Sequence, residues 1–281
     1  MRFHTTNFIR RIVKVTVVAI CLTAGLATGQ SAYAIDVTQN GDTLTITGDN
    51  SDDAVYIQGL EGFGGPVGTW TSLGIDTYYG VQNIHVDLQG GDNLLWMYDL
   101  WFAGDVTFAA GDGNDQVTMN QSNVNNVTFE LGGGDNDVHF EFNMLGPVSV
   151  SGGSGCDRVE MLHVDCEAIT CITRGGDDFV GIGGGYSTWD TGFGDVSENI
   201  TVRTGSGRDL VALVGVNALY GDTLIRLGRQ DDILAMAFGG DPNEFFGEFT
   251  ARGGGGYDTL YRYPENVYYN TPTFQSFEEE H

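Results

Sequence analysis

A short turn rich in glycine and aspartate recurs along this chain and constrains its fold more than any other feature. Four copies stand out, at residues 111–115, 152–157, 205–209 and 253–258. Each copy ends in Asp and is followed two residues later by an aliphatic side chain, at Val117, Val159, Val211 and Leu260. Repetition at a fixed spacing of about 20–50 residues is typical of solenoids, in which each repeat adds one coil.

Alignment of the copies on their acid places nine positions in one column. They are Asp53, Asp92, Asp115, Asn136, Asp157, Asp178, Asp209, Asp232 and Asp258, and most steps between them are 21–23 residues. Apolar residues alternate with other residues on both sides of the column, as at Val117/Met119 after it and Val106/Phe108 before it. A period of two indicates strands with one buried face. We therefore predict an all-β, right-handed parallel β-helix with about 21–23 residues per coil.

Residues 1–34 have the pattern of an export signal. A basic start, which includes Arg2 and Lys14, precedes an apolar run at residues 12–26, and residues 32–34 read Ala-Tyr-Ala. This pattern predicts cleavage after Ala34, and the short run favours a cleaved signal over the alternative of a membrane anchor. We expect an extracytoplasmic protein, secreted, at the cell surface or periplasmic, with no membrane span after removal of the signal.

The chain that remains would be strongly acidic. Residues 1–34 hold four of the 12 basic residues and none of the 38 acidic ones, which leaves eight arginines and a net charge of −30. Such a charge disfavours nucleic acid and anionic lipid as partners. It suits multivalent cations, or simply solubility, and both interpretations stay open.

Residues 35–281 are expected to form a single β-helix domain. Residues 35–60 would supply the N-terminal cap and first coil, with a hairpin turn at Asn40-Gly41. Residues 263–281 would form the C-terminal cap and an acidic tail that frays. Longer steps in the repeat indicate insertions at residues 62–79, 183–194 and 239–247. Loops on a regular scaffold often carry function.

The turn resembles a known calcium-binding repeat. Residues 152–159 and 253–260 match Gly-Gly-x-Gly-x-Asp-x-aliphatic in full, and residues 110–117 and 204–211 lack only the first Gly. This is the repeat of the hemolysin-type (repeats-in-toxin) β-rolls. The single turn per long coil is similar to that of exported bacterial β-helix proteins. The resemblance implies Ca²⁺ between successive turns, with Asp115, Asp157, Asp209 and Asp258 as the matching acids.

Further acids near the turns extend this calcium hypothesis. The candidate ligands are Asp92, Asp112, Asp115, Asp135, Asn136, Asp137, Asp157, Asp209 and Asp258. The early turns are favoured because no arginine lies near them in sequence. In the later coils Arg203, Arg226 and Arg252 each precede their acid by six residues, so they should stack as a ladder. The alternatives are a metal-free turn ladder and arginines held in surface ion pairs.

Two outward-facing residues are weak candidates for catalysis. His139 and Glu160 each lie three residues after their acid, so they should project from neighbouring coils beside Asp137 and Arg158. Polysaccharide-cleaving β-helices use acids along one face, but ordinary surface polarity explains the same pattern. We therefore assign no catalytic activity. We expect a structural or binding protein whose partner is a polysaccharide or a cell-surface component, with a polysaccharide-degrading enzyme as the alternative.

Two smaller features complete the predictions. Phe179, Leu210 and Ile233 each follow their acid and should align into an apolar strip, covered by residues 183–194 or by a partner. Cys156, Cys166 and Cys171 follow the signal, and their odd number leaves one thiol over if two of them pair. Sequence does not choose between the pairings.

Overall fold

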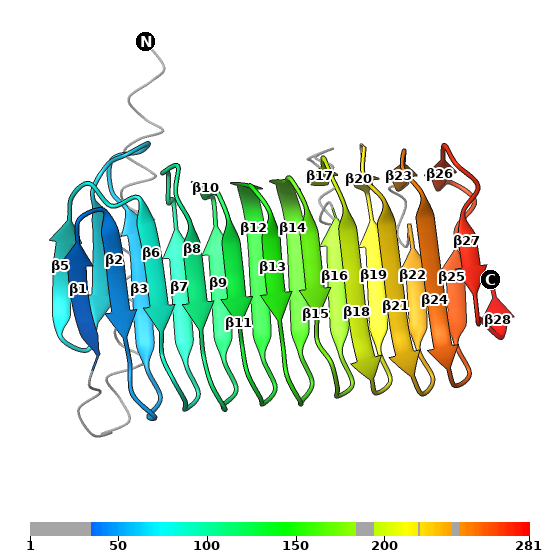
Figure 1. Cartoon of the computed structure of the whole chain (residues 1–281), viewed down its shortest axis with the longest axis horizontal. Coiled ribbons are helices and arrows are strands. Elements are labelled where there is room, and N and C mark those ends of the chain that lie inside the picture. Colours follow the sequence, from blue (N-terminus) through cyan, green and yellow to red (C-terminus); the bar gives the residue numbers. More distant parts are fainter. Residues whose placement is uncertain (1–34, 184–193, 219, 238–241) are drawn as a thin grey trace, which may run out of the picture. The chain divides into compact units, whose positions relative to one another are not determined.

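The computed structural model describes residues 35–183, 194–218, 220–237 and 242–281. These residues form a β-solenoid of about eight turns built mostly from parallel strands (Figure 1). The predicted parallel β-helix is thus confirmed. The described residues contain no helix, and therefore none that would cross a membrane. The predicted signal and residues 184–193 of the second insertion lie outside the described part of the chain.

The first face of the solenoid is one sheet, called here the first sheet. Its strands, in spatial order, are β1 (Asp36–Asn40), β2 (Thr43–Thr47), β6 (Asn83–Asp87), β8 (Val106–Ala109), β11 (Val127–Glu130), β13 (Val148–Ser151), β15 (Ile169–Ile172), β18 (Ile200–Ser206), β21 (Thr223–Arg229), β24 (Phe249–Gly255) and β27 (Thr273–Gln275). Figure 1 shows them side by side in the order of the chain, because each coil contributes one strand.

The second face follows the glycine–aspartate turn. It contains β3 (Ala54–Gly59), β7 (Leu94–Tyr98), β9 (Gln116–Asn120), β12 (Asp137–Leu145), β14 (Arg158–Cys166), β16 (Phe179–Gly183), β19 (Leu210–Val214), β22 (Ile233–Met236), β25 (Thr259–Arg262) and β28 (Glu279–Glu280).

The third face is shorter. It contains β10 (Asn123–Val124), β17 (Gly194–Val196), β20 (Val216–Ala218), β23 (Glu244–Phe245) and β26 (Val267–Tyr268), together with the last residues of β12 and β14. At the corner between the second and third faces, Gln121, Phe142 and His163 adopt positive φ values of 51°, 54° and 51°. This conformation is uncommon for residues other than glycine, so the sequence carried no signal for this corner.

The core is filled by the alternating apolar residues that the sequence indicated. Val117 and Met119 after the turn and Val106 and Phe108 before it are all buried. Equivalent residues stack coil on coil, as in the register of Val106 with Val127. A single coil has no second layer to cover its apolar side, so stability comes from contacts between neighbouring coils.

Both ends of the solenoid are finished by additional strands. The predicted Asn40-Gly41 hairpin is present, since β1 pairs antiparallel with β2 at the edge of the first sheet. The first insertion folds into strands β4 (Val67–Thr71) and β5 (Gly74–Tyr78), which pair antiparallel beside β3. We expected the acidic tail to fray; instead β28 pairs with β25, and Glu280 forms an ion pair with Arg262 at 2.6 Å.

Glycine is required in the turn because successive turns touch through their backbones. Gly134, Gly155 and Gly176 occupy equivalent places and have φ values of 99°, 128° and 124°. A Cβ atom on Gly155 would lie 2.2 Å from the carbonyl oxygen of Gly134, and one on Gly176 would lie 1.9 Å from that of Gly155. The repeated glycine is therefore a consequence of close coil stacking as well as of chain reversal.

Candidate functional site

The aligned acids form a column inside the turn, with one correction to the predicted register. Asp115, Asp157 and Asp232 are at most 1% exposed. In the second coil the buried position belongs to Asn93, and Asp92 is exposed. The sequence alignment of the turns placed Asp92 in the column because glycines precede both Asp92 and Asn93. A shift of one residue changes the spacing between repeats very little. The complete column is Asp53, Asn93, Asp115, Asn136, Asp157, Asp178, Asp209, Asp232 and Asp258.

Hydrogen bonds join each member of this buried column after Asp53 to the coil before it. Oδ1 of Asp178 accepts from the backbone N–H of Asp157 at 2.9 Å, and Oδ1 of Asp209 accepts from that of Asp178 at 2.9 Å. The same bond recurs from Asn93 to Asp258. Glu278 ends the series by accepting from the N–H of Asp258 at 2.7 Å. The column therefore fastens coil to coil along the whole turn.

The second carboxyl oxygen of each aspartate in the column is buried and lacks a hydrogen-bond partner among the described residues. The two asparagines differ. The Nδ2 group of Asn93 donates to the carbonyl oxygen of Gly91 at 3.0 Å, and that of Asn136 donates to the carbonyl oxygen of Gly134 at 3.2 Å. A protonated aspartate would offer an O–H in the same place. A hydrogen-bond donor at the position of the second carboxyl oxygen would therefore find a turn carbonyl to bind.

Burial dominates the electrostatics of the column. It raises the pKa of Asp115 to about 6 and the pKa values of Asp178 and Asp232 to about 7. Neighbouring carboxylates of the column add to the effect, since Asp209 and Asp258 both raise the pKa of Asp232. Desolvation and like charge both disfavour the ionised form. At neutral pH the column thus needs protons or cations.

A second row of hydrogen bonds runs along the solvent side of the turn. Oδ1 of Asp92 accepts from the N–H of Asn114 at 2.8 Å, and Oδ1 of Asp135 accepts from the N–H of Cys156 at 2.7 Å. Here the side chain reaches the following coil, whereas the buried column reaches the preceding one. In the later coils the backbone N–H of Arg208 donates to Asp177 Oδ1 at 2.9 Å and its guanidinium pairs with Asp177 Oδ2 at 2.8 Å. The backbone hydrogen bond first, and the guanidinium contact second, lower the pKa of Asp177.

The nine candidate calcium ligands occupy four different places. Asp115, Asn136, Asp157, Asp209 and Asp258 lie in the buried column, and Asp92 and Asp135 lie in the outer row. Asp112 is exposed elsewhere in the turn, and Asp137 lies on the second face. Among the described residues no three His, Cys, Asp or Glu side chains converge on a point that would hold a metal.

Calcium coordination requires about six to eight oxygen ligands. The buried column offers one unpartnered carboxyl oxygen per aspartate. The turn carbonyls are already engaged, since the N–H of Gly134 donates to Ser154 O and that of Gly155 donates to Gly175 O, both at 2.8 Å. With these side-chain positions, the one unpartnered carboxyl oxygen of each aspartate fits the binding of a proton better than the coordination of Ca²⁺.

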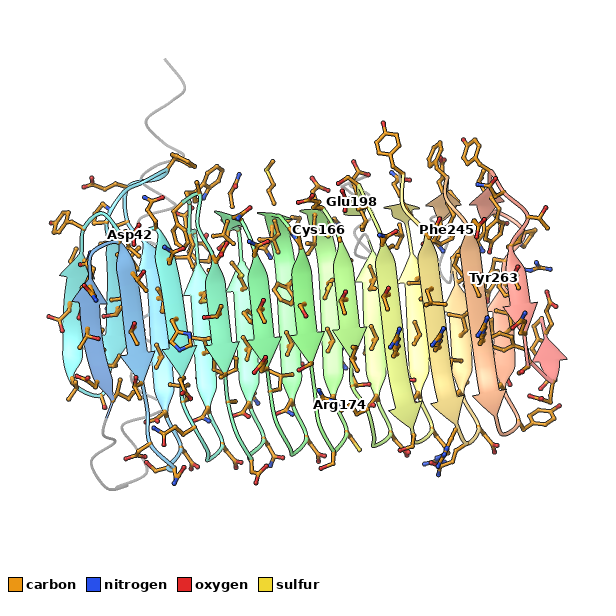
Figure 2. All side chains as sticks on the ribbon, viewed as in Figure 1. Asp42, Cys166, Arg174, Glu198, Phe245 and Tyr263 are labelled. Atoms are coloured by element: carbon orange, nitrogen blue, oxygen red, sulfur yellow. The ribbon has the colours of Figure 1, made fainter. Side chains whose placement is uncertain are left out.

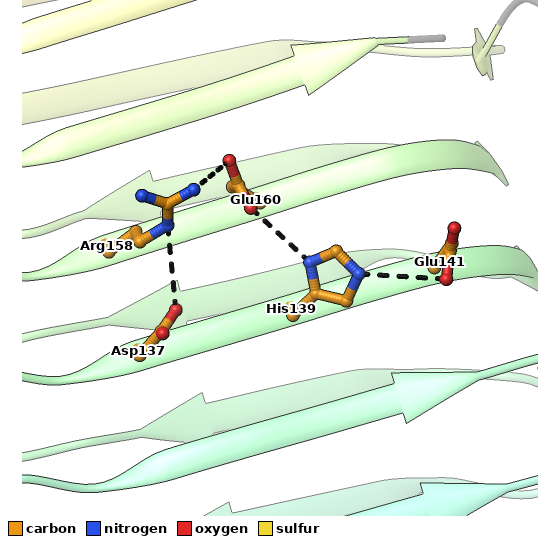
Figure 3. Close-up of polar contacts among 5 residues, drawn as sticks. All are labelled: Asp137, His139, Glu141, Arg158 and Glu160. Carbon is orange, nitrogen blue, oxygen red and sulfur yellow. Dashed lines mark hydrogen bonds and ion pairs between the residues drawn. The ribbon is translucent and has the colours of Figure 1, made fainter. Parts of the chain in front are cut away.

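The polar patch around His139 forms as the alignment predicted (Figure 3). His139 Nδ1 lies 3.5 Å from Glu160 Oε2, and His139 Nε2 lies 3.9 Å from Glu141 Oε2. Arg158 contacts Glu160 on its own strand, β14, and Asp137 on the neighbouring strand, β12. The charges in this patch are paired with one another, and none of its residues lines the groove described below. Such mutual ion pairs are typical of a polar surface that stabilises the fold.

The arginines and the apolar residues that were predicted to form two rows in the later coils are each aligned from strand to strand. Arg203 pairs with Arg226 and Arg226 with Arg252 along the first sheet. The apolar strip is likewise aligned, with Phe179 beside Leu210 and Leu210 beside Ile233. Its predicted cover was residues 183–194, of which residues 184–193 lie outside the described part of the chain.

The three cysteines of the described residues are unpaired. Cys166 and Cys171 are buried in the core, and burial raises the pKa of the Cys166 thiol to about 12 and that of the Cys171 thiol further. Cys156 is exposed in the outer row of the turn. A thiol becomes a nucleophile as the thiolate, so the two buried residues are structural.

The sequence did not predict a groove on the third face, whose volume is about 710 Å³. Figure 2 shows two of its lining residues, Cys166 and Glu198, along the upper edge of the molecule, with Arg174 at the opposite turn. Its acidic lining consists of Asp165, Glu167, Asp195 and Glu198. Two of these acids lie in adjacent coils, since the backbone N–H of Asp195 donates to Asp165 Oδ1 at 3.1 Å. No repeated spacing in the sequence marks these acids, since Asp165 follows its column acid by eight residues and Asp195 follows Asp178 by 17.

Aromatic side chains flank these acids along the third face. Phe63, which is 71% exposed, and Phe102 line the groove. In later coils Phe246 and Tyr269 stack with their ring centroids 4.1 Å apart. Both follow third-face strands that are in register, β23 and β26. The third face therefore presents acids in its middle and aromatic rings on both sides of them.

No protein-family model, no curated protein and no solved structure matches this chain.

Proposed function

We propose that this protein is an extracytoplasmic binding solenoid and that its third face holds an extended polysaccharide. The groove of about 710 Å³ carries this proposal, because acids and the exposed ring of Phe63 line it and the stacked rings of Phe246 and Tyr269 lie further along the same face. Carboxylates such as Asp165 and Asp195 accept hydrogen bonds from sugar hydroxyls. Aromatic faces such as those of Phe63 and Phe246 offer apolar stacking surfaces.

The charge of the groove narrows the ligand class. Asp165, Glu167, Asp195 and Glu198 would repel an anionic polymer. A neutral polyhydroxylated chain avoids this repulsion and uses the carboxylates as hydrogen-bond acceptors. The ligand we propose for this face is therefore a neutral linear polysaccharide. The export signal predicted for residues 1–34 would place the protein where such polymers occur.

Cleavage of the bound polymer is the alternative activity. Glycosidases work with two carboxyl groups on either side of the bond that breaks, and Asp165 and Asp195 belong to adjacent coils of the groove. An assay for new reducing ends with the same polysaccharides separates cleavage from binding. Product formation that is lost in Asp195→Asn would replace the binding proposal with an enzymatic one.

The test of binding is a calorimetric titration of the purified protein with neutral linear oligosaccharides. Phe246→Ala should weaken binding about tenfold, because a stacked ring contributes roughly 1 kcal/mol or more beyond its buried area. Tyr257→Ala is the matched control, since Tyr257 is 54% exposed but lies at the turn. Equal affinities of both variants and the wild type would contradict the proposal.

We also propose that Ca²⁺ binds to the early turns and stabilises them. This role is supported by the resemblance of the turn to hemolysin-type repeats and by the unpartnered oxygens of Asp115 and Asp157. The exposed carboxylates of Asp92, Asp112 and Asp135 lie near the same turns. A cation there would need backbone or water oxygens in addition to these groups.

A further inference from the structure

Three arginines stand one above another on the outer surface of the first sheet. Arg203, Arg226 and Arg252 come from the consecutive strands β18, β21 and β24, and all three are exposed. Neighbouring strands lie about 4.8 Å apart, so the three side chains start from the sheet at that repeat. We call this row the arginine ladder.

The arginine ladder has no ion pair or hydrogen bond within the described part of the chain. Among the other exposed arginines, Arg208 pairs with Asp177 at 2.8 Å and Arg262 pairs with Glu280 at 2.6 Å, whereas Arg229, three residues after Arg226, has no ion pair among the described residues either. Acidic residues outnumber basic ones 38 to 12 in this chain. Three unpaired cations at coil spacing repel one another, so the row costs stability that no contact in the described residues offsets.

The surface beside the arginine ladder is flat. Two residues after each arginine the aligned position is glycine, at Gly205, Gly228 and Gly254. Side chains are excluded there, since a Cβ atom on Gly228 would lie 1.9 Å from the carbonyl oxygen of Gly205. The backbone thus forms a bare floor next to three guanidinium groups. On the other side, Thr201 and Thr250 add hydroxyl groups, with Leu224 between them in the row.

We propose that the arginine ladder binds a linear polysaccharide that carries carboxylates, such as a chain of uronic acids. Guanidinium groups bind carboxylates through two parallel hydrogen bonds. An extended chain of pyranose units advances per sugar by about the spacing of neighbouring strands, so successive sugars meet successive coils. The glycine floor leaves room for the sugar rings.

The extent of the row limits the length of chain that is bound. Ile172 precedes Arg203 in the row and Gln275 follows Arg252. Further along the same row Glu130 is in register with Ser151 and would repel an anionic polymer. The ladder therefore contacts about three sugars. This site lies on the first sheet and is independent of the acidic groove on the third face.

The test is a titration of the purified protein with short oligouronates in EDTA, which removes bridging calcium. The same oligosaccharides with their carboxyl groups reduced to alcohols are the matched ligand control. We expect binding of the oligouronate that weakens with salt, and little binding of the reduced form. Arg226→Gln should lower the affinity about tenfold, and the triple glutamine variant of the ladder should abolish binding.

Two further variants are controls that show whether binding takes place at the arginine ladder. Arg208→Gln removes an exposed arginine outside the ladder and should leave oligouronate binding unchanged. Asp195→Asn changes the third-face groove and should also leave it unchanged, so the two proposals fail separately. A melting curve should show the triple variant folded and at least as stable as the wild type, because it loses only repulsion.

Three results would overturn the proposal. One is equal binding of the reduced oligosaccharide, which would mean that carboxylates are not recognised. Another is unchanged binding by the folded triple variant, which would place the site elsewhere. The third is tighter binding of single-stranded nucleic acid of equal charge than of the oligouronate.

Discussion

The backbone N–H of Asp209 donates a hydrogen bond of 2.9 Å to Oδ1 of Asp232, one coil later, while Oδ2 of Asp232 has no partner among the described residues. This half-satisfied carboxyl group recurs along the buried column. Burial makes it costly to ionise, and the backbone bond fixes its place. The turn that fastens the coils together is therefore also the part of the solenoid that should respond to pH.

Stability should fall as the pH rises through 6 and 7. The folded-state pKa values of Asp115, Asp178 and Asp232 are raised to about 6, 7 and 7 from an ordinary value of 3.8. A raised pKa means that the folded state binds the proton more tightly, so the stabilisation is complete below pH 3.8 and is lost through the folded pKa. Urea unfolding between pH 4.5 and 8 measures it. A free energy of unfolding that rises over this range would contradict the prediction.

Asp232→Asn should stabilise the protein at pH 8. Asparagine keeps the acceptor for the Asp209 N–H, and its Nδ2 group would reach the turn carbonyl as in Asn93 and Asn136. We expect an increase in Tm of about 2–4 °C, which corresponds to roughly 1 kcal/mol, and a weaker effect at pH 4.5. Asp231→Asn is the control and should have a smaller effect, because Asp231 is exposed, its oxygen accepts from Tyr257 N–H in either form, and its charge raises the pKa of Asp232 less than burial does.

Calcium should raise Tm at pH 8 if the early turns bind it, and the rise should vanish at pH 4.5, where protons occupy the column. The expected effect is about 2–4 °C at saturating calcium and low salt, with EDTA as the reference. Asp115→Asn should reduce the effect, whereas Asp231→Asn in a late turn should not. No shift with calcium at either pH would leave the turn as a metal-free, proton-stabilised structure.

Gly155→Ala should destabilise the solenoid by about 2–4 kcal/mol. Its φ of 128° disfavours alanine, and the added Cβ atom would lie 2.2 Å from Gly134 O. Gly255→Ala is the matched control, since Gly255 is exposed and a Cβ atom there meets nothing within 4 Å. Chemical denaturation of both variants measures the difference. Equal midpoints would mean that the turns do not stack through their backbones.

Of the three cysteines in the described residues, only Cys156 should react with a thiol reagent in the folded protein. Burial raises the pKa of Cys166 to about 12 and holds Cys171 away from solvent. In denaturant all three should react. Fewer reactive thiols in unfolded, unreduced protein would reveal a disulfide and contradict the unpaired state.

Much of the fold could be predicted from the sequence because each coil of a solenoid repeats the same local structure. The steps of 21–23 residues predicted the coil, and the alternation around Val117 predicted which side chains are buried. The stacking of Arg203, Arg226 and Arg252 followed from their constant distance to the acid. In each case neighbouring coils share one register, so spacing along the chain becomes position on a face.

The candidate site was less predictable. Asp92 and Asn93 are adjacent in sequence, and only the path of the backbone decides that Asn93 enters the buried column. The groove combines Phe63 from an early insertion with Asp165 and Asp195 from later coils. Such a site leaves no local pattern. The left-handed corner at Gln121 and Phe142 was also missed, since neither residue type favours that conformation.

The sequence by itself determined that this protein is a solenoid, how long its coils are and which strand faces are apolar. Those properties depend on residue spacing and on the exclusion of apolar side chains from water. Only the tertiary structure decided that the repeated aspartates point inward, that their second oxygens lack partners and that a groove lies on the third face. These depend on how one coil sits on the next, which sets the direction of each side chain and the neighbours that it meets.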